Sequence, residues 1–136
     1  MWGVIRAISM SFDVKQQSRY WINSSDEDMA AAISLFDKKH YRQALFFAHL
    51  AIEKLLKSYI VGQTKDHPPR IHNLMRLSEI AKLQLNEQRE MVLREFSIYK
   101  IAGRYPDWLG DGIDQQIANE DMSKAKEVIE WIKTPL

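Results

Sequence analysis

The segment from Tyr41 to Val61 is apolar on two sides, and this feature constrains the fold of the chain most strongly. One side repeats at the i, i+3, i+4, i+7 spacing of an α-helix. Its residues are Tyr41, Ala44, Leu45, Ala48, Ala51, Ile52, Leu55 and Tyr59. Phe46, Phe47 and Leu50 add a second apolar side. Such a helix is typical of the centre of a bundle or of an interface shared with a partner subunit, and Gly62 is its expected end.

Four other segments have helical periodicity, and no segment alternates apolar and polar residues as a strand does. The expected helices span residues 13–39, 73–83, 86–102 and 120–133. The sequence therefore predicts an all-α fold, an antiparallel up-and-down bundle of four to five helices. We expect one domain over residues 1–136, with residues 1–12 as an N-terminal extension.

Several positions within these helices carry specific expectations. Ser24 to Glu27 resemble a capping box that restarts the first helix, and Ala30 to Ala32 favour close approach of a neighbouring helix. Trp21, Met29, Ile33 and Phe36 lie near one face of that helix. The residues expected to point inward from the later helices are Leu74, Leu77, Ala81, Val92, Phe96, Tyr99, Met122, Ala125, Ile129 and Ile132.

Composition excludes several classes of protein. The chain has no cysteine, which excludes disulfides, a thiolate nucleophile and Cys-ligated zinc or iron–sulfur clusters. No apolar run approaches the roughly 20 residues that span a bilayer. The stretch Met1 to Phe12 lacks the small-residue cleavage site of a signal peptide. We therefore expect a cytoplasmic protein.

The charge of the chain is unevenly distributed. The total is +1, from 19 Lys+Arg and 18 Asp+Glu, which argues against broad binding to long nucleic acids. Residues 1–37 carry −2, residues 38–76 carry +6, and residues 77–136 carry −3. All four histidines, His40, His49, His67 and His72, lie in the basic segment. This segment predicts a local anion site on one face of the bundle.

Most catalytic motifs are absent from the sequence. There is no Gly-rich phosphate loop, no His-Glu-x-x-His and no Glu-x-x-His pair of the kind that holds di-iron in bundles. His49 and Glu53 are four residues apart and could hold a metal, but a solvated hydrogen-bonding pair is the stronger interpretation. We expect no metal and no cofactor.

Two groups of residues remain as candidates. Arg42, His49, Glu53 and Lys57 share one flank of the central helix, and Glu53 and Lys57 form a favourable i, i+4 pair. This flank is either a solvated face or a surface that faces phosphate. Arg70 and His72 lie in a loop stiffened by Pro68 and Pro69, at the start of the next helix. They could hold an anion with that helix N-terminus, or His72 could simply cap or pack at the turn.

Arg104 and Tyr105, before Pro106, form a third candidate group. Arg104 would bind an anion or satisfy the last carbonyls of the preceding helix. Tyr105 would frame a pocket or pack.

These residues together resemble the HEPN domain, a family of small helical bundles. The resemblance rests on Ala44, Ala48 and the string Ala51-Ile52-Glu53-Lys54-x-x-Lys57, then His72-Asn73-Leu74, and finally Arg104-Tyr105-Pro106-Asp107. It spans roughly residues 24–132. The family implies a bundle that dimerises and presents a polar groove to a nucleotide or RNA. It also implies a separate minimal nucleotidyltransferase as partner, in modules that resemble toxin–antitoxin pairs.

Many HEPN proteins are metal-independent ribonucleases with an Arg, four to six residues and then a His. Here Arg104 has no histidine within that distance, while Arg42 and His49 match the spacing only in the central helix. The candidate catalytic residues are therefore His72, Arg104, His49 and Arg42. A ribonuclease would use a histidine to activate the ribose 2′-hydroxyl and an arginine to stabilise the phosphate.

The leading hypothesis is a HEPN protein that binds a nucleotide or RNA phosphate and acts with a nucleotidyltransferase. The residues that would contact the ligand are Lys54, Lys57, Arg70, His72, Arg104 and Tyr105. The alternatives are the endoribonuclease and a helical protein-interaction module without ligand, because residues 32–51 resemble one tetratricopeptide unit. We expect a homodimer in solution.

Overall fold

The computed structural model describes residues 12–99 and 113–134. This part of the chain contains five α-helices, one 3₁₀ turn and no strand. The elements are α2 (Val14–Asp37), α3 (Tyr41–Thr64), α4 (Leu74–Ile80), α5 (Glu87–Phe96), the 3₁₀ turn η1 (Ser97–Tyr99) and α6 (Gln115–Lys133). The prediction of an all-α bundle is confirmed. None of the described helices is long and apolar enough to cross a membrane.

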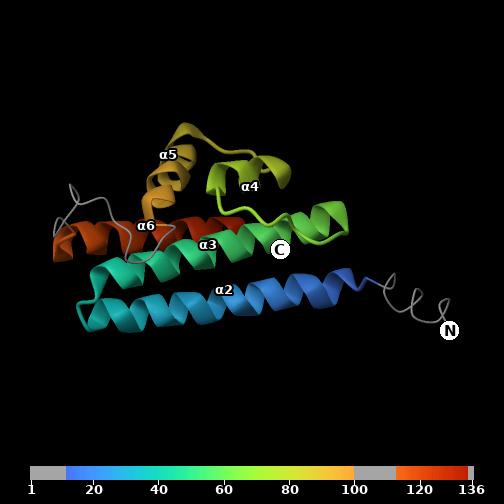
Figure 1. The fold of residues 1–136 in the computed structure, drawn as a ribbon. Coiled ribbons are helices and arrows are strands. Elements are labelled where there is room, and N and C mark those ends of the chain that lie inside the picture. Colours follow the sequence, from blue (N-terminus) through green and yellow to red (C-terminus); the bar gives the residue numbers. More distant parts are fainter. Residues whose placement is uncertain (1–11, 100–112, 135–136) are drawn as a thin grey trace.

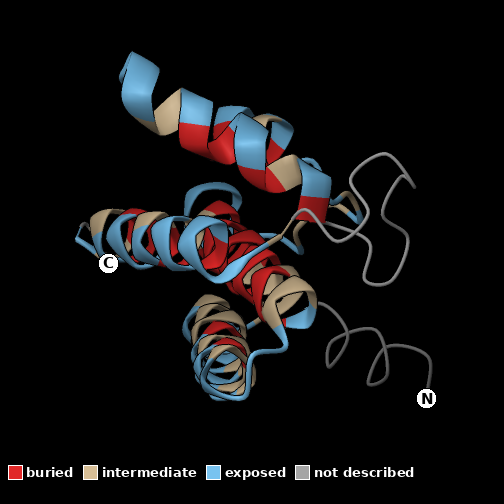
Figure 2. Ribbon diagram, turned by 90° about the vertical axis from the view of Figure 1, so that its left-hand side faces the viewer, coloured by how far each residue is buried: buried red, intermediate tan, exposed pale blue. Residues whose placement is uncertain are grey.

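The three long helices lie side by side, with α3 in the middle (Figure 1). α2 runs antiparallel to α3, and α6 runs in the same direction as α3. The shorter α4 and α5 lie above α3. In the sequence they connect the end of α3 to the start of α6, so that α3 and α6 can run in the same direction. Figure 2 shows buried residues concentrated along α3. The two-sided apolar segment is therefore the centre of the bundle, because α2 covers one side of it and α4, η1 and α6 cover the other.

A seam of small residues holds α2 against α3. Ser18, Ser25 and Ala32 are seven residues apart on α2, and Ser58, Ala51 and Ala44 are seven apart on α3. The Ser18 and Ser58 hydroxyls lie 3.0 Å apart, and the Ser25 hydroxyl donates to the Ala51 carbonyl at 2.6 Å. The same antiparallel register places Ala32 opposite Ala44, and both are fully buried. The close approach expected from the alanines of α2 thus involves serines as well.

Four helices begin at a polar side chain that caps a free backbone N–H. Asp13 accepts from Gln16 at 3.0 Å, Asn73 from Arg76 at 3.0 Å, Asn86 from Arg89 at 2.8 Å and Asp114 from Ile117 at 2.9 Å. The Asp114 cap starts α6 five residues before the predicted Glu120. Three helices end before a lysine with positive φ: Lys39 follows α2, Lys65 follows α3 and Lys82 follows α4.

Several predicted details were wrong. The capping box at Ser24 to Glu27 does not restart α2, which is continuous because these serines bond to α3 instead. Gly62 does not end α3, which continues to Thr64. α5 ends as an α-helix at Phe96 and continues only as a 3₁₀ turn. Ile33 does not join Met29 and Phe36 against the core, because it is 39% exposed.

The inward positions predicted for the later helices are confirmed. The structure buries Leu74, Leu77, Ala81, Val92, Phe96, Tyr99, Met122, Ala125, Ile129 and Ile132 in one core with the apolar residues of α3. A rigid core of this kind positions the polar residues along α3.

Candidate functional site

Two oppositely charged side chains of α3 are buried in contact with each other. Glu53 is 4% exposed and Lys57 is 6% exposed, and the Lys57 ammonium lies 3.1 Å from Glu53 Oε2. The sequence predicted this i, i+4 pair and left open whether its flank is a solvated face or a surface that faces phosphate. The solvated face is wrong for these two residues, because α2 and the segment leading into α4 cover this flank of α3. A buried carboxylate needs such partners, since charge without compensation is costly away from water.

The second partner of Glu53 is His72. Its Nδ1 atom lies 3.1 Å from Glu53 Oε1 and 3.2 Å from Oε2. A carboxylate only accepts hydrogen bonds, so Nδ1 carries a proton and donates a hydrogen bond to Glu53. His72 stands between Ile71, which packs against the core, and Asn73, which caps α4. These neighbours fix the backbone, while the side chain of His72 remains 68% exposed.

Trp21 of α2 closes the other side of the buried pair. The Lys57 ammonium lies 5.5 Å from the centre of the Trp21 ring, within the range of a cation–π contact. Trp21 Nε1 is buried and has no hydrogen-bond acceptor in the part of the chain that the structure describes. Tyr20 stands edge-on to Trp21 at 5.2 Å between ring centres and is 59% exposed. The order of contacts is therefore Trp21, Lys57, Glu53 and His72.

Four exposed cations lie on the same two segments of the chain, at the start of α2 and after the end of α3: Lys15, Arg19, Lys65 and Arg70. We call them the basic end. They come from the first two turns of α2 and from the segment after α3. These two parts meet through the Phe12–His67 ring contact at 4.6 Å and the Ser18–Ser58 contact. In Figure 1 the start of α2 and the end of α3 lie at the same end of the molecule.

None of the four cations of the basic end has an ion pair within the described residues, whereas at least half of the twelve other cations there do. Within residues 12–99 and 113–134, none of its four side chains contacts a carboxylate. Six other cations are each paired with a carboxylate: Lys54, Lys57, Arg76, Arg94, Lys124 and Lys133. Two acids lie in the same segments and lower the formal charge there from +4 to +2: Asp13, which caps α2, and Asp66, which accepts from the His67 amide. The basic end is thus a local excess of positive charge.

Residues 18–134 match the family model of the HEPN domain. The chain belongs to the HEPN family. A crystal structure of TT1696 from Thermus thermophilus superposes with a TM-score of 0.73 at 20% identity, covering 88% of this chain and 98% of that one. ST0689, an archaeal HEPN homologue, superposes with a TM-score of 0.61 at 17% identity, covering 86% and 95%. These structures share the fold. No curated protein sequence matches the chain.

The structure places Lys54, Arg42 and His49 apart from the basic end. Lys54 points to α2, where its ammonium lies 2.7 Å from Asp28 and 2.8 Å from the Ser24 hydroxyl. Arg42 is half-buried on the first turn of α3, and His49 is completely buried. The expectation that His49 and Glu53 form a solvated pair was therefore wrong. Arg104 and Tyr105 lie outside the described residues.

The structure brings together only part of the predicted site. It joins His72 to Glu53 and Lys57, whereas Arg70 stays exposed two residues away. Sequence reasoning missed Trp21, Lys15 and Arg19, because no spacing rule links the start of α2 to the end of α3. The described residues hold no cluster of three metal-ligating side chains.

A small cleft between α5 and α6 is separate from this site. It has a volume of about 120 Å³, and the Arg89 guanidinium lies 4.3 Å from the centre of the Trp131 ring at its wall. Asn86, Val92 and Lys124 also line it. Its cations already have partners, Trp131 for Arg89 and Glu95 for Lys124. The basic end is the stronger candidate for an anion.

Proposed function

We propose that this HEPN protein binds the phosphate of a nucleotide or RNA at its basic end, beside His72. We further propose that it acts with a minimal nucleotidyltransferase in a module that resembles a toxin–antitoxin pair. The single observation that carries the binding proposal is the basic end itself. Its four cations lack acidic partners within the described residues, while at least six of the twelve other cations there have them.

The side chains at this end suit a nucleotide chemically. The guanidinium groups of Arg19 and Arg70 can each bind a phosphate through two parallel hydrogen bonds. Tyr20 offers an exposed ring on which a base can stack. Lys54 and Lys57 support this site only indirectly, because Asp28 and Glu53 already neutralise them. The nucleotidyltransferase partner follows from the family resemblance.

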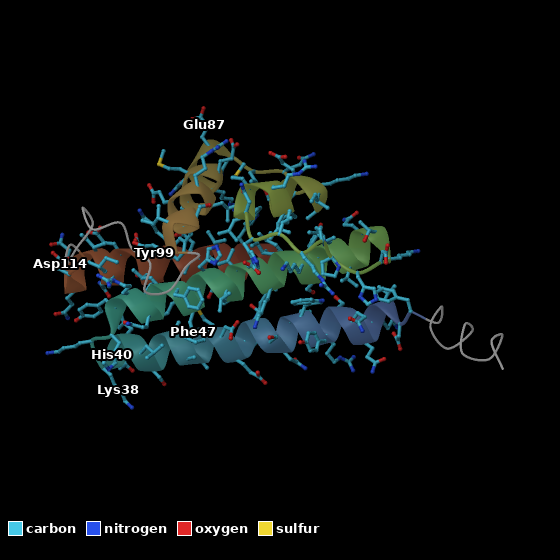
Figure 3. All side chains as sticks on the ribbon, in the orientation of Figure 1. Lys38, His40, Phe47, Glu87, Tyr99 and Asp114 are labelled. Carbon is cyan, nitrogen blue, oxygen red and sulfur yellow. The ribbon has the colours of Figure 1, made fainter. Side chains whose placement is uncertain are left out.

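Titration at low salt with fluorescently labelled ATP, GTP and a short single-stranded RNA tests the binding proposal. We expect Arg70→Ala and Arg19→Ala to weaken binding. Each lost phosphate contact should make the dependence of log K for binding on log salt concentration less steep, by about 0.7–1 in the magnitude of the slope. Lys38→Ala is the matched control, because Lys38 is exposed at the opposite end of α2 (Figure 3). Equal loss in Lys38→Ala, or no binding by the wild-type protein, would contradict the proposal.

Co-purification from the native cell tests the partner. We expect a nucleotidyltransferase to be recovered with the chain. A stable complex with another class of protein and no nucleotidyltransferase would contradict this part of the proposal.

One observation favours an endoribonuclease as the second candidate. Glu53 holds Nδ1 of His72, so the other ring nitrogen, Nε2, is left with a lone pair that can accept the proton of a ribose 2′-hydroxyl. RNA cleavage in EDTA that is lost in His72→Ala would support this function. Intact RNA after prolonged incubation would exclude it.

We also propose that the protein is a homodimer. α2, α4 and α6 cover much of α3, but Phe46 and Phe47 remain half-buried, and Met91 and Ile98 are 58% and 53% exposed. Light scattering at micromolar concentration should report twice the mass of the chain. A monomer at that concentration would contradict the proposal.

A further inference from the structure

We propose that His72 is a phosphoryl-acceptor site, and that its Nε2 atom forms a covalent bond to phosphorus. The proposal goes beyond reversible binding at the basic end and does not depend on it. It rests on the contact between His72 and Glu53, and on the exposure of the imidazole ring.

The geometry determines which nitrogen is the nucleophile. The Nδ1–H group donates a hydrogen bond to Glu53 at 3.1 Å, so a neutral ring must carry its lone pair on Nε2. The side chain is 68% exposed, so a donor can approach the ring from solvent. A carboxylate behind an imidazole fixes both its tautomer and its orientation, and it raises the electron density of the free nitrogen. His72 therefore presents a nucleophile in one defined direction.

The buried carboxylate also stabilises the product. Phosphorylation at Nε2 leaves a positively charged ring that still donates from Nδ1 to Glu53. Glu53 is 4% exposed, so the attraction between the two charges acts in a medium less polar than water. The Lys57 ammonium, 3.1 Å from Oε2, offsets part of the carboxylate charge but holds it in place. Arg70, two residues before His72 and without an ion pair within the described residues, attracts the anionic donor.

The transfer balances with one co-reactant, a phosphoryl donor such as a phosphoramidate or an acyl phosphate. The Nε2 lone pair forms the N–P bond while the bond from phosphorus to the leaving group breaks. The leaving group takes that electron pair: a phosphoramidate releases ammonia, whose nitrogen takes a proton from solvent, and an acyl phosphate releases a carboxylate, which stays ionised. The imidazole keeps its Nδ1 proton and becomes a phosphoimidazolium paired with Glu53. No electron leaves or enters the system.

The other histidines of the chain provide internal controls. His40 is exposed at the start of α3, where its side chain makes no capping hydrogen bond (Figure 3). His67 is exposed, and the contact found for its ring is with Phe12. His49 is completely buried. Within the described residues, only His72 combines an exposed ring with a buried carboxylate.

Reaction of the full chain with potassium phosphoramidate tests the proposal. Phosphorylated sites are mapped at several times by mass spectrometry under conditions that preserve phosphohistidine. NMR identifies the modified nitrogen. We expect His72 to react at least about tenfold faster than His40 and His67, and at Nε2. Equal rates at the three histidines, faster reaction at His40 or His67, or a phosphoryl group on Nδ1 would overturn the proposal.

Glu53→Gln then tests the role of the carboxylate. We expect the rate at His72 to fall to that of His40, while His40 and His67 in the same molecule are unchanged. An unchanged rate in a folded Glu53→Gln protein would overturn the role of Glu53. The wild-type comparison needs no substitution, so it stays decisive if the variant fails to fold. Because phosphoramidate carries no base or sugar, selective reaction without nucleotide binding would separate this inference from the proposed function.

Discussion

The hydroxyl of Ser25 donates a hydrogen bond to the backbone carbonyl of Ala51, across 2.6 Å between α2 and α3. Ser25 is 1% exposed and Ala51 is fully buried, so water does not replace this bond. Seven residues earlier on α2, Ser18 meets Ser58 in the same register. Small side chains at this spacing let the two helices approach closely, and their hydroxyl groups find partners on the facing helix.

Enlarging Ser25 should destabilise the bundle more than removing its hydroxyl. We expect Ser25→Ala to lower the free energy of unfolding by about 1 kcal/mol, the net value of one hydrogen bond. Ser25→Leu should lower it by about 1–3 kcal/mol, because the larger side chain forces α2 away from α3. Urea denaturation followed by circular dichroism measures both. Glu27→Ala, at an exposed position of the same helix, should stay within about 0.5 kcal/mol of wild type.

Breaking the buried Glu53–Lys57 pair should cost more than replacing it. Glu53→Ala leaves the Lys57 ammonium buried without its carboxylate, and we expect a loss of about 3 kcal/mol or more in the free energy of unfolding. Glu53→Met combined with Lys57→Met removes both charges and should recover much of that loss. Denaturant unfolding of Glu53→Met, Lys57→Met and the double variant gives the coupling energy. Additive losses would show that the two side chains do not depend on each other.

Gly62 offers a stabilising substitution. It lies in the last turns of α3, and an added Cβ would meet no atom within 4 Å. We expect Gly62→Ala to raise the free energy of unfolding by about 0.5–1 kcal/mol, because alanine loses less backbone entropy in a helix. Thermal unfolding measures the gain. The neighbouring Gln63→Ala, also exposed, should change stability by only a few tenths of a kcal/mol, and a loss in Gly62→Ala would contradict this account.

Periodicity predicted the long helices well because burial dominates their patterns. Leu55 of α3 and Ile132 of α6 are each completely buried where the spacing placed them. The pattern could not distinguish a carboxylate on a solvated face from one covered by another segment. Glu53 and Lys57 have the spacing of an ordinary exposed pair, and they are buried because α2 and residues 70–73 cover this flank of α3.

Helix ends were predicted less well, since a local signal competes with tertiary contacts. Ser24 and Ser25 resemble a helix cap, but both hydroxyls bond to α3. The Ser24 hydroxyl accepts from Lys54 and the Ser25 hydroxyl donates to the Ala51 carbonyl, so α2 continues through them. Gly62 permits a left-handed end but does not require one. The chain turns instead at Lys65, where φ is 57°. Of the basic end, the sequence predicted Arg70 as an anion contact but not Lys15 or Arg19, because the cations come from segments about 50 residues apart in the sequence.

Lys39 and Lys38 should respond oppositely to glycine, although they are adjacent in the turn between α2 and α3. Lys39 has φ of 67°, which strains any residue with a Cβ, whereas Lys38 has φ of −90°. We expect Lys39→Gly to raise the free energy of unfolding by about 1 kcal/mol, because glycine adopts the left-handed region without penalty. Lys38→Gly should lower it by up to about 1 kcal/mol, because it only adds freedom to the unfolded chain. Both side chains are exposed, so each variant loses one solvated charge and the comparison isolates the backbone. Thermal unfolding at one salt concentration measures the difference, and equal shifts in the two variants would contradict backbone strain at Lys39.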